Sequence, residues 1–133
     1  PHLIRGPKEP IDAGIQKFYT SLLSVLKQPM FRTSRWQLLE CTPAWEENNT
    51  WESFIAFAWE GAERELALVV INYAPHDGQC YLKMPLAEKS FGNWQLRDMM
   101  HEVSYDRNGN DLMAKGLYLG MKPWQYHVFN VIK

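Results

Sequence analysis

The hydrophobic pattern of this chain changes its period once, at Pro29. Before that residue, apolar side chains recur three or four positions apart, as they do on one face of an α-helix. Pro10 suits a first helical turn and Pro29 cannot continue a helix, so we predict a helix over 11–27. The face of this predicted helix is formed by Ile11, Ile15, Phe18, Leu22 and Val25.

After Pro29 the apolar residues alternate with a period of two, which is typical of β-strands. Turn-forming residues separate the strands every 8–12 positions, and no strand–helix–strand rhythm occurs, so a Rossmann-type fold is excluded. We therefore predict a mainly-β chain: an antiparallel β-sandwich of about eight strands preceded by one N-terminal α-helix. The expected strands cover 35–41, 53–59, 66–73, 79–84, 94–99, 103–106, 117–121 and 126–131, with a loop over 107–111 at the Asn108-Gly109 turn signal.

Length and charge bound the classes of function. The chain has 133 residues and a formal net charge of −1, so it has no basic excess for holding a nucleic-acid backbone. It has no apolar run long enough to cross a membrane, and we expect neither nucleic acid nor membrane as a partner. We divide it into a lead-in and helix over 1–29 and a β-sandwich domain over 30–133.

The two cysteines, Cys41 and Cys80, lie 39 positions apart in apolar surroundings. Neither belongs to a Cys-x-x-Cys motif or has a histidine nearby, so zinc binding by these thiols is not expected. We interpret them as buried, reduced residues, with a disulfide between them as the alternative.

No residue pattern in the sequence predicts a catalytic site or a metal-binding site. Two carboxylate pairs, Asp98 with Glu102 and Asp106 with Asp111, are near in sequence only, and proximity alone does not place two carboxyls across a substrate. The oxygen-rich stretch 106–111 lacks the glycine and glutamate positions of an EF-hand, so it is interpreted as a turn, with a different kind of calcium site as the alternative. We predict no catalytic residue, no metal ligand and no cofactor, and expect the histidines at the surface or the core edge: His2, His76, His101 and His127.

Aromatic residues make up 14% of the chain, including six tryptophans. Trp45, Trp51 and Trp124 lie in or beside predicted loops, where flat rings can face a carbohydrate. They are the candidate carbohydrate-binding residues. The alternative is that they fix loops against the core or against a neighbouring domain.

A series of motifs, in order along nearly the whole chain, resembles the C-terminal region of bacterial α-amylase-family glycoside hydrolases. The motifs are Phe18-Tyr19 with Leu22-Leu23, Trp36-Gln37-Leu38-Leu39, Pro43-Ala44-Trp45, Phe54 to Trp59, Leu68 to Tyr73, Gln79 to Leu82, Leu96-Arg97-Asp98, Tyr105-Asp106-Arg107, Gly116 to Leu119 and Pro123 to Phe129.

The resemblance implies a non-catalytic domain. In that family a (β/α)₈ barrel carries the active site and a β-sandwich follows it. The helix before Pro29 would then be the last helix of the barrel, and Leu96-Arg97-Asp98 would have a structural role. We expect this chain to stabilise the catalytic barrel of its parent enzyme, which would act on α-glucans as a hydrolase or transferase.

The expected partners are therefore the barrel of the same parent chain and, through weak contact, α-glucan. An exposed apolar face near Phe18 and Leu22 is a candidate surface for dimerisation. We expect a cytoplasmic location. The alternative function is a stand-alone carbohydrate-binding module that uses the loop tryptophans.

Overall fold

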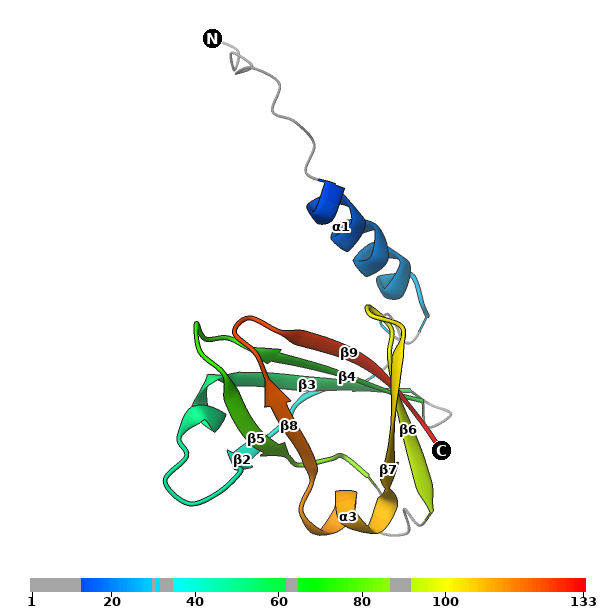
Figure 1. The fold of residues 1–133 in the computed structure, drawn as a ribbon. Coiled ribbons are helices and arrows are strands. Elements are labelled where there is room, and N and C mark those ends of the chain that lie inside the picture. Colours follow the sequence, from blue (N-terminus) through cyan, green and yellow to red (C-terminus); the bar gives the residue numbers. More distant parts are fainter. Residues whose placement is uncertain (1–12, 30, 32–34, 62–64, 87–91) are drawn as a thin grey trace.

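The computed structural model describes residues 13–29, 31, 35–61, 65–86 and 92–133. In this part of the chain, nine strands form two antiparallel sheets, and one long helix lies near the N-terminus (Figure 1). The predicted mainly-β sandwich with a preceding helix is confirmed. The elements are α1 (Ala13–Leu26), β1 (Arg35–Leu38), β2 (Cys41–Pro43), the 3₁₀ helix η1 (Thr50–Ser53), β3 (Phe54–Glu60), β4 (Leu66–Asn72), β5 (Gly78–Leu82), β6 (Asn93–Asp98), β7 (Val103–Asn108), α3 (Gly109–Ala114), β8 (Leu117–Met121) and β9 (Tyr126–Ile132).

The larger sheet has the strand order β1-β3-β4-β9-β6-β7, and the smaller sheet has the order β2-β5-β8. Strands β3 and β4 form an antiparallel hairpin that pairs along its whole length inside the larger sheet. Strands β1 and β7 are the edges of that sheet. The hydrophobic core takes alternate residues from both sheets, which is the arrangement of a sandwich. Its members include Ala56, Ala58, Leu68, Val70, Cys80, Leu82, Leu119 and Phe129.

The face of β3 that points away from the core carries aromatic side chains. Phe57 and Trp59 alternate with the buried core residues of the strand and contact each other with ring centroids 5.2 Å apart. Trp36 on β1 lies 6.0 Å from Phe57, and Phe31 lies 4.9 Å from Trp59. These rings cover the outside of the larger sheet, which explains why β3 is apolar on both faces.

The strand predicted over 35–41 is wrong as a single strand. The structure divides it into β1, which pairs with β3, and β2, which pairs with β5 in the other sheet. Between them, the Leu39 N–H donates to the Ala56 carbonyl on one sheet, and the Glu40 carbonyl accepts from the Lys83 N–H, next to the end of β5. The chain crosses between the sheets here, and the apolar alternation does not change at the crossing.

The loop predicted over 107–111 is also wrong. Strand β7 continues to Asn108, and the short helix α3 begins at Gly109. The Asn108 side chain accepts a hydrogen bond of 2.8 Å from the Asn110 N–H. Asparagine therefore acts as a helix N-cap, a role that it fills as readily as a place in a turn.

Helix α1 agrees with the described part of the predicted helix; residues 11 and 12 lie outside the described residues. Its contact with the sandwich is small. Val25 is its one buried residue, and the Phe18 ring packs against Tyr126 of β9 at 5.5 Å. In Figure 1 the rest of the helix projects away from the sheets. Four large apolar side chains on it are about half exposed: Ile15 (54%), Tyr19 (56%), Leu23 (57%) and Leu26 (42%).

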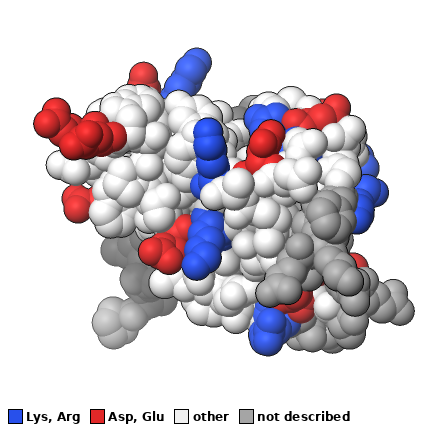
Figure 2. All heavy atoms as spheres, turned by 90° about the horizontal axis from the view of Figure 1, so that it is seen from below, with Lys and Arg blue, Asp and Glu red and all other residues white. Residues whose placement is uncertain are grey.

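Charged residues are dispersed over the one face of the molecule that Figure 2 shows. On the face shown in Figure 2, lysine and arginine side chains alternate with aspartate and glutamate across a largely uncharged surface. Among the described residues, no helix combines the length and the apolar character that crossing a membrane requires.

Candidate functional site

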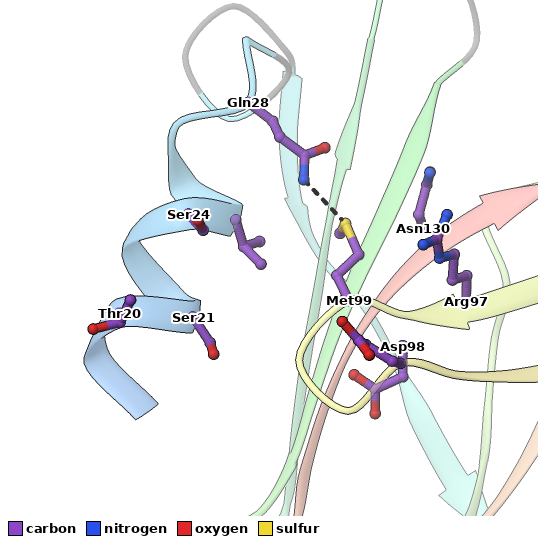
Figure 3. Close-up of a pocket in the computed structure, with 10 residues that line it drawn as sticks. Thr20, Ser21, Ser24, Gln28, Arg97, Asp98, Met99 and Asn130 are labelled. Atoms are coloured by element: carbon purple, nitrogen blue, oxygen red, sulfur yellow. Dashed lines mark hydrogen bonds between the residues drawn. The ribbon is translucent and has the colours of Figure 1, made fainter. Parts of the chain in front are cut away.

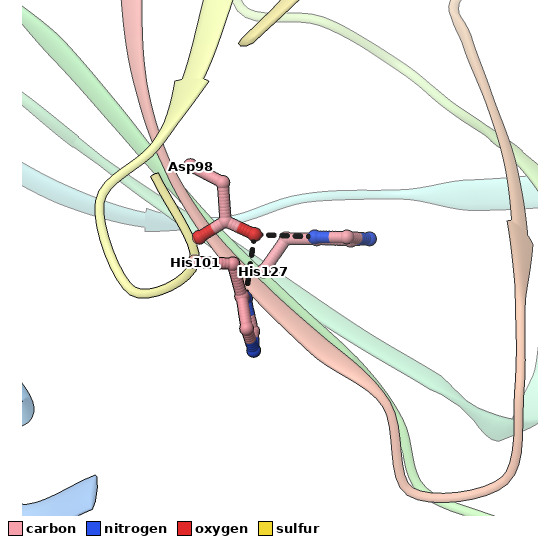
Figure 4. A group of neighbouring side chains, drawn as sticks. All are labelled: Asp98, His101 and His127. Atoms are coloured by element: carbon pink, nitrogen blue, oxygen red, sulfur yellow. Dashed lines mark hydrogen bonds and ion pairs between the residues drawn. The ribbon is translucent and has the colours of Figure 1, made fainter. Parts of the chain in front are cut away.

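Three polar side chains, of which one is distant in sequence from the other two, meet at one end of the larger sheet. Asp98 is the last residue of β6, His101 lies on the β6–β7 turn, and His127 is the second residue of β9 (Figure 4). Strands β6 and β9 are hydrogen-bonded neighbours, with Asp98 opposite Phe129. The pairing therefore places Asp98 beside His127, and the tight turn returns His101 to the same carboxylate.

The carboxylate of Asp98 holds both imidazoles. Its Oδ2 atom lies 2.8 Å from Nδ1 of His101 and 2.8 Å from Nδ1 of His127. The other oxygen, Oδ1, accepts a hydrogen bond of 3.0 Å from the Met100 N–H. Because Met100 fixes Oδ1, the lone pairs of Oδ2 point at the two histidines.

Burial differs across this Asp–His–His cluster. The exposed fraction of the side chain is 1% for Asp98, 10% for His127 and 46% for His101. Burial by itself raises the pKa of the Asp98 carboxyl, but the hydrogen bonds from His127, His101 and the Met100 N–H outweigh it and lower the pKa to about 2. The carboxylate therefore stays ionised although it is buried.

An aromatic ring lies next to each imidazole. His127 is stacked on Phe129, with ring centroids 4.8 Å apart and planes 18° apart. His101 lies 5.2 Å from the ring of Tyr126. Burial, followed by the negative charge of Asp98, raises the pKa of the Tyr126 hydroxyl, which therefore stays neutral.

A cavity of about 460 Å³ lies between α1 and the end of β6 (Figure 3). Its walls are mainly polar and include Ser21 and Ser24 of α1 together with Arg97 and Glu102. Gln28 spans it, since its Nε2 atom lies 3.4 Å from the Met99 sulfur. Asp98 also lines this cavity, whereas His101 and His127 are not among its lining residues.

The three candidate tryptophans are not brought together by any ring contact among the described residues. Trp45 and Trp124 are about half exposed, while Trp51 packs against the core. Trp124 contacts Tyr73 edge-on, with centroids 5.2 Å apart, and both rings are exposed. A paired exposed aromatic surface thus exists at the β8–β9 turn, and it consists of Trp124 with Tyr73, without Trp45 or Trp51.

The carboxylate pairs have separate environments. Asp98 faces the two histidines, and the contacts of its carboxylate in the described part of the chain include neither Glu102 nor Arg97. Asp111 lies in the first turn of α3, where a negative charge favours a helix, and Asp106 is an exposed residue of β7.

Both cysteines are free thiols on neighbouring strands, as the first interpretation predicted, although Cys41 is only half-buried. A hydrogen bond from the Cys80 thiol lowers the pKa of Cys41. The same bond, together with burial, raises the pKa of Cys80.

Each histidine, considered alone, is expected at the surface or the core edge, and this expectation does not bring His101 and His127 together. The two residues are 26 positions apart in sequence. Only the β6–β9 pairing joins them. The alternation of β9 was the available signal, because it places His127 on the same face as Phe129.

No model of a known protein family matches the chain, and no curated protein matches it.

Proposed function

We propose that this chain is a non-catalytic β-domain of an α-amylase-family glycosidase, which packs against the catalytic (β/α)₈ barrel of its parent enzyme and stabilises it. The parent acts on α-glucans. Two observations support the proposal. The motif series extends along nearly the whole chain in the family's order, and α1 carries a second apolar stripe that the sandwich does not cover.

The apolar stripe on α1, formed by Tyr19, Leu23 and Leu26, is the observation that carries the proposal. These positions follow each other at spacings of four and three, so they share one face of the helix. A different face, with Phe18 and Val25, contacts the sandwich. A helix with two apolar faces is suited to lie between two bodies.

Burial of the apolar stripe against the barrel would make a substantial contribution to the stability of the enzyme. Each of its side chains is about half exposed. Complete burial of a large apolar side chain contributes about 1.5–3 kcal/mol, so covering the exposed halves contributes about 3 kcal/mol in total. That is a large fraction of the stability of a typical domain.

The test uses the full parent enzyme, obtained by reading the coding sequence upstream of Pro1 and expressing the whole frame. Leu23→Glu should lower the thermal midpoint of the enzyme, because it places a charge in the contact with the barrel. Lys17→Glu is the control, since it introduces the same glutamate side chain at an exposed position on the opposite side of α1 from the stripe. Equal midpoints for the two variants would contradict the packing role.

Two measurements on the isolated chain complete the test. It should release no reducing sugar from starch, and release above a blank would overturn the non-catalytic assignment. Sedimentation should detect a monomer. A dimer that Leu23→Glu dissociates would assign the stripe to a second copy of the chain.

The exposed pair of Tyr73 and Trp124 favours a second candidate function, a carbohydrate-binding module. This alternative predicts that maltooligosaccharide changes the tryptophan fluorescence, and that Trp124→Ala abolishes the change. Trp45→Ala is the control, since this ring is equally exposed but has no ring contact with the pair. An unchanged spectrum on titration would remove the alternative.

A further inference from the structure

We propose that Asp98, His101 and His127 bind one zinc ion, through Oδ2 of the carboxylate and the Nδ1 atoms of both imidazoles. This inference does not depend on the proposed function. It rests on the side chains that meet at the end of β6 and on their different exposure to solvent.

The cluster has the composition and the size of a zinc site. One ligand atom from each residue lies within 4.8 Å of the other two. Imidazole nitrogen and carboxylate oxygen are both zinc ligands, at about 2.0–2.2 Å from the metal, which places tetrahedral ligand atoms about 3.4 Å apart. The two O···N distances of 2.8 Å must therefore open slightly when the ion enters.

The Nδ1 atoms are the chelating nitrogens. In Figure 4 the two imidazoles point their Nδ1 atoms at the same carboxylate oxygen and their Nε2 atoms away from each other. An ion therefore meets three donors only on the Nδ1 side. Zinc binding requires an unprotonated Nδ1, so each coordinating imidazole is neutral and carries its single proton on Nε2.

Two of the ligands are fixed and one can adjust. The Met100 N–H holds the Asp98 carboxylate, and stacking on Phe129 holds His127. Such outer contacts orient metal ligands and strengthen binding. His101 lies on the β6–β7 turn with nearly half of its side chain exposed, so it can move aside to admit the ion. A water molecule from this side completes the tetrahedron.

The test titrates the purified chain with zinc sulfate in a calorimeter and with cobalt(II) in a spectrophotometer. We expect one ion per chain and the visible absorption of tetrahedral cobalt. His101→Ala should weaken zinc binding by at least about tenfold, because even the loss of an outer partner costs about 10–100-fold. Because nearly half of the His101 side chain is exposed, we expect the His101→Ala variant to fold.

His76→Ala is the matched control, because it removes an exposed imidazole from the β4–β5 turn, outside the cluster. It should bind zinc as the unmodified chain does. The absence of saturable zinc binding would overturn the proposal, and so would zinc binding that His101→Ala leaves unchanged. The cluster would then be a hydrogen-bonded lock between β6 and β9 only.

Discussion

Replacing Asp98 by asparagine should remove part of the pH dependence of the domain's stability, together with the stabilisation that the carboxylate contributes near neutral pH. The substitution keeps the shape of the side chain but removes the charge that both imidazoles contact. In the folded chain the pKa of this carboxyl is about 2, against an ordinary value of 3.8. A depressed pKa stabilises the folded state above the ordinary value, and this stabilisation disappears as the pH falls through 2.

The magnitude follows from the shift. A difference of nearly two pH units corresponds to about 2 kcal/mol, at about 1.4 kcal/mol for each unit. Because the side chain is almost completely buried, solvent screens little of this. We therefore expect Asp98→Asn to lower the free energy of unfolding by about 2 kcal/mol or more at pH 5–7. The deficit relative to the unmodified chain should shrink by about 2 kcal/mol between pH 5 and pH 2.

Urea unfolding at a series of pH values measures this deficit, with the six tryptophans as the fluorescent probe. Asp77→Asn is the control, because Asp77 is an exposed carboxylate on the β4–β5 turn. Its effect should be small at every pH. A deficit for Asp98→Asn that stays the same from pH 7 to pH 2 would refute the reasoning, because the buried charge would then contribute nothing to stability.

Three further substitutions test the packing. Asn72→Ala should lower the free energy of unfolding in urea by about 2–4 kcal/mol, because the buried Nδ2 atom of Asn72 donates to three backbone carbonyls around the β4–β5 and β8–β9 turns. A loss below about 1 kcal/mol, which is the net contribution of one hydrogen bond, would contradict this. Gly116→Ala should lower the thermal midpoint clearly, since φ is +91° and a Cβ atom would collide with the Leu82 carbonyl oxygen. Glu60→Gln should change the unfolding free energy by less than about 1 kcal/mol, because its 2.8 Å ion pair with Arg35 is exposed.

Much of the fold could be predicted because side-chain periodicity follows burial. Strands β3, β4, β8 and β9 begin and end within one residue of their predicted bounds. The single strand predicted over 35–41 and the loop predicted over 107–111 are wrong, because the local residue pattern does not indicate which strand a segment pairs with or whether a helix follows it. The chain changes sheets at Leu39 without a change in alternation, and Asn108 favours a turn and a helix start equally.

The Asp98–His101–His127 cluster could not be predicted, because it depends on which strands become neighbours. His127 lies next to Asp98 only because β9 inserts between β4 and β6. Strand order is a property of the whole chain, whereas alternation is a property of a few residues. A prediction that treats each histidine separately therefore cannot find a site that two strands and a turn build together.

The edges of the larger sheet also influence how this protein can associate. An edge strand has unpaired backbone groups that can template aggregation when the strand is long and apolar. Strand β1 has four residues and begins with the charged Arg35, and β7 has Asp106 and Arg107 among its exposed residues. These edges discourage strand-to-strand addition of further copies. Under the proposed function, contact with the barrel would therefore use the side chains of the apolar stripe on α1 and not the backbone of a sheet edge.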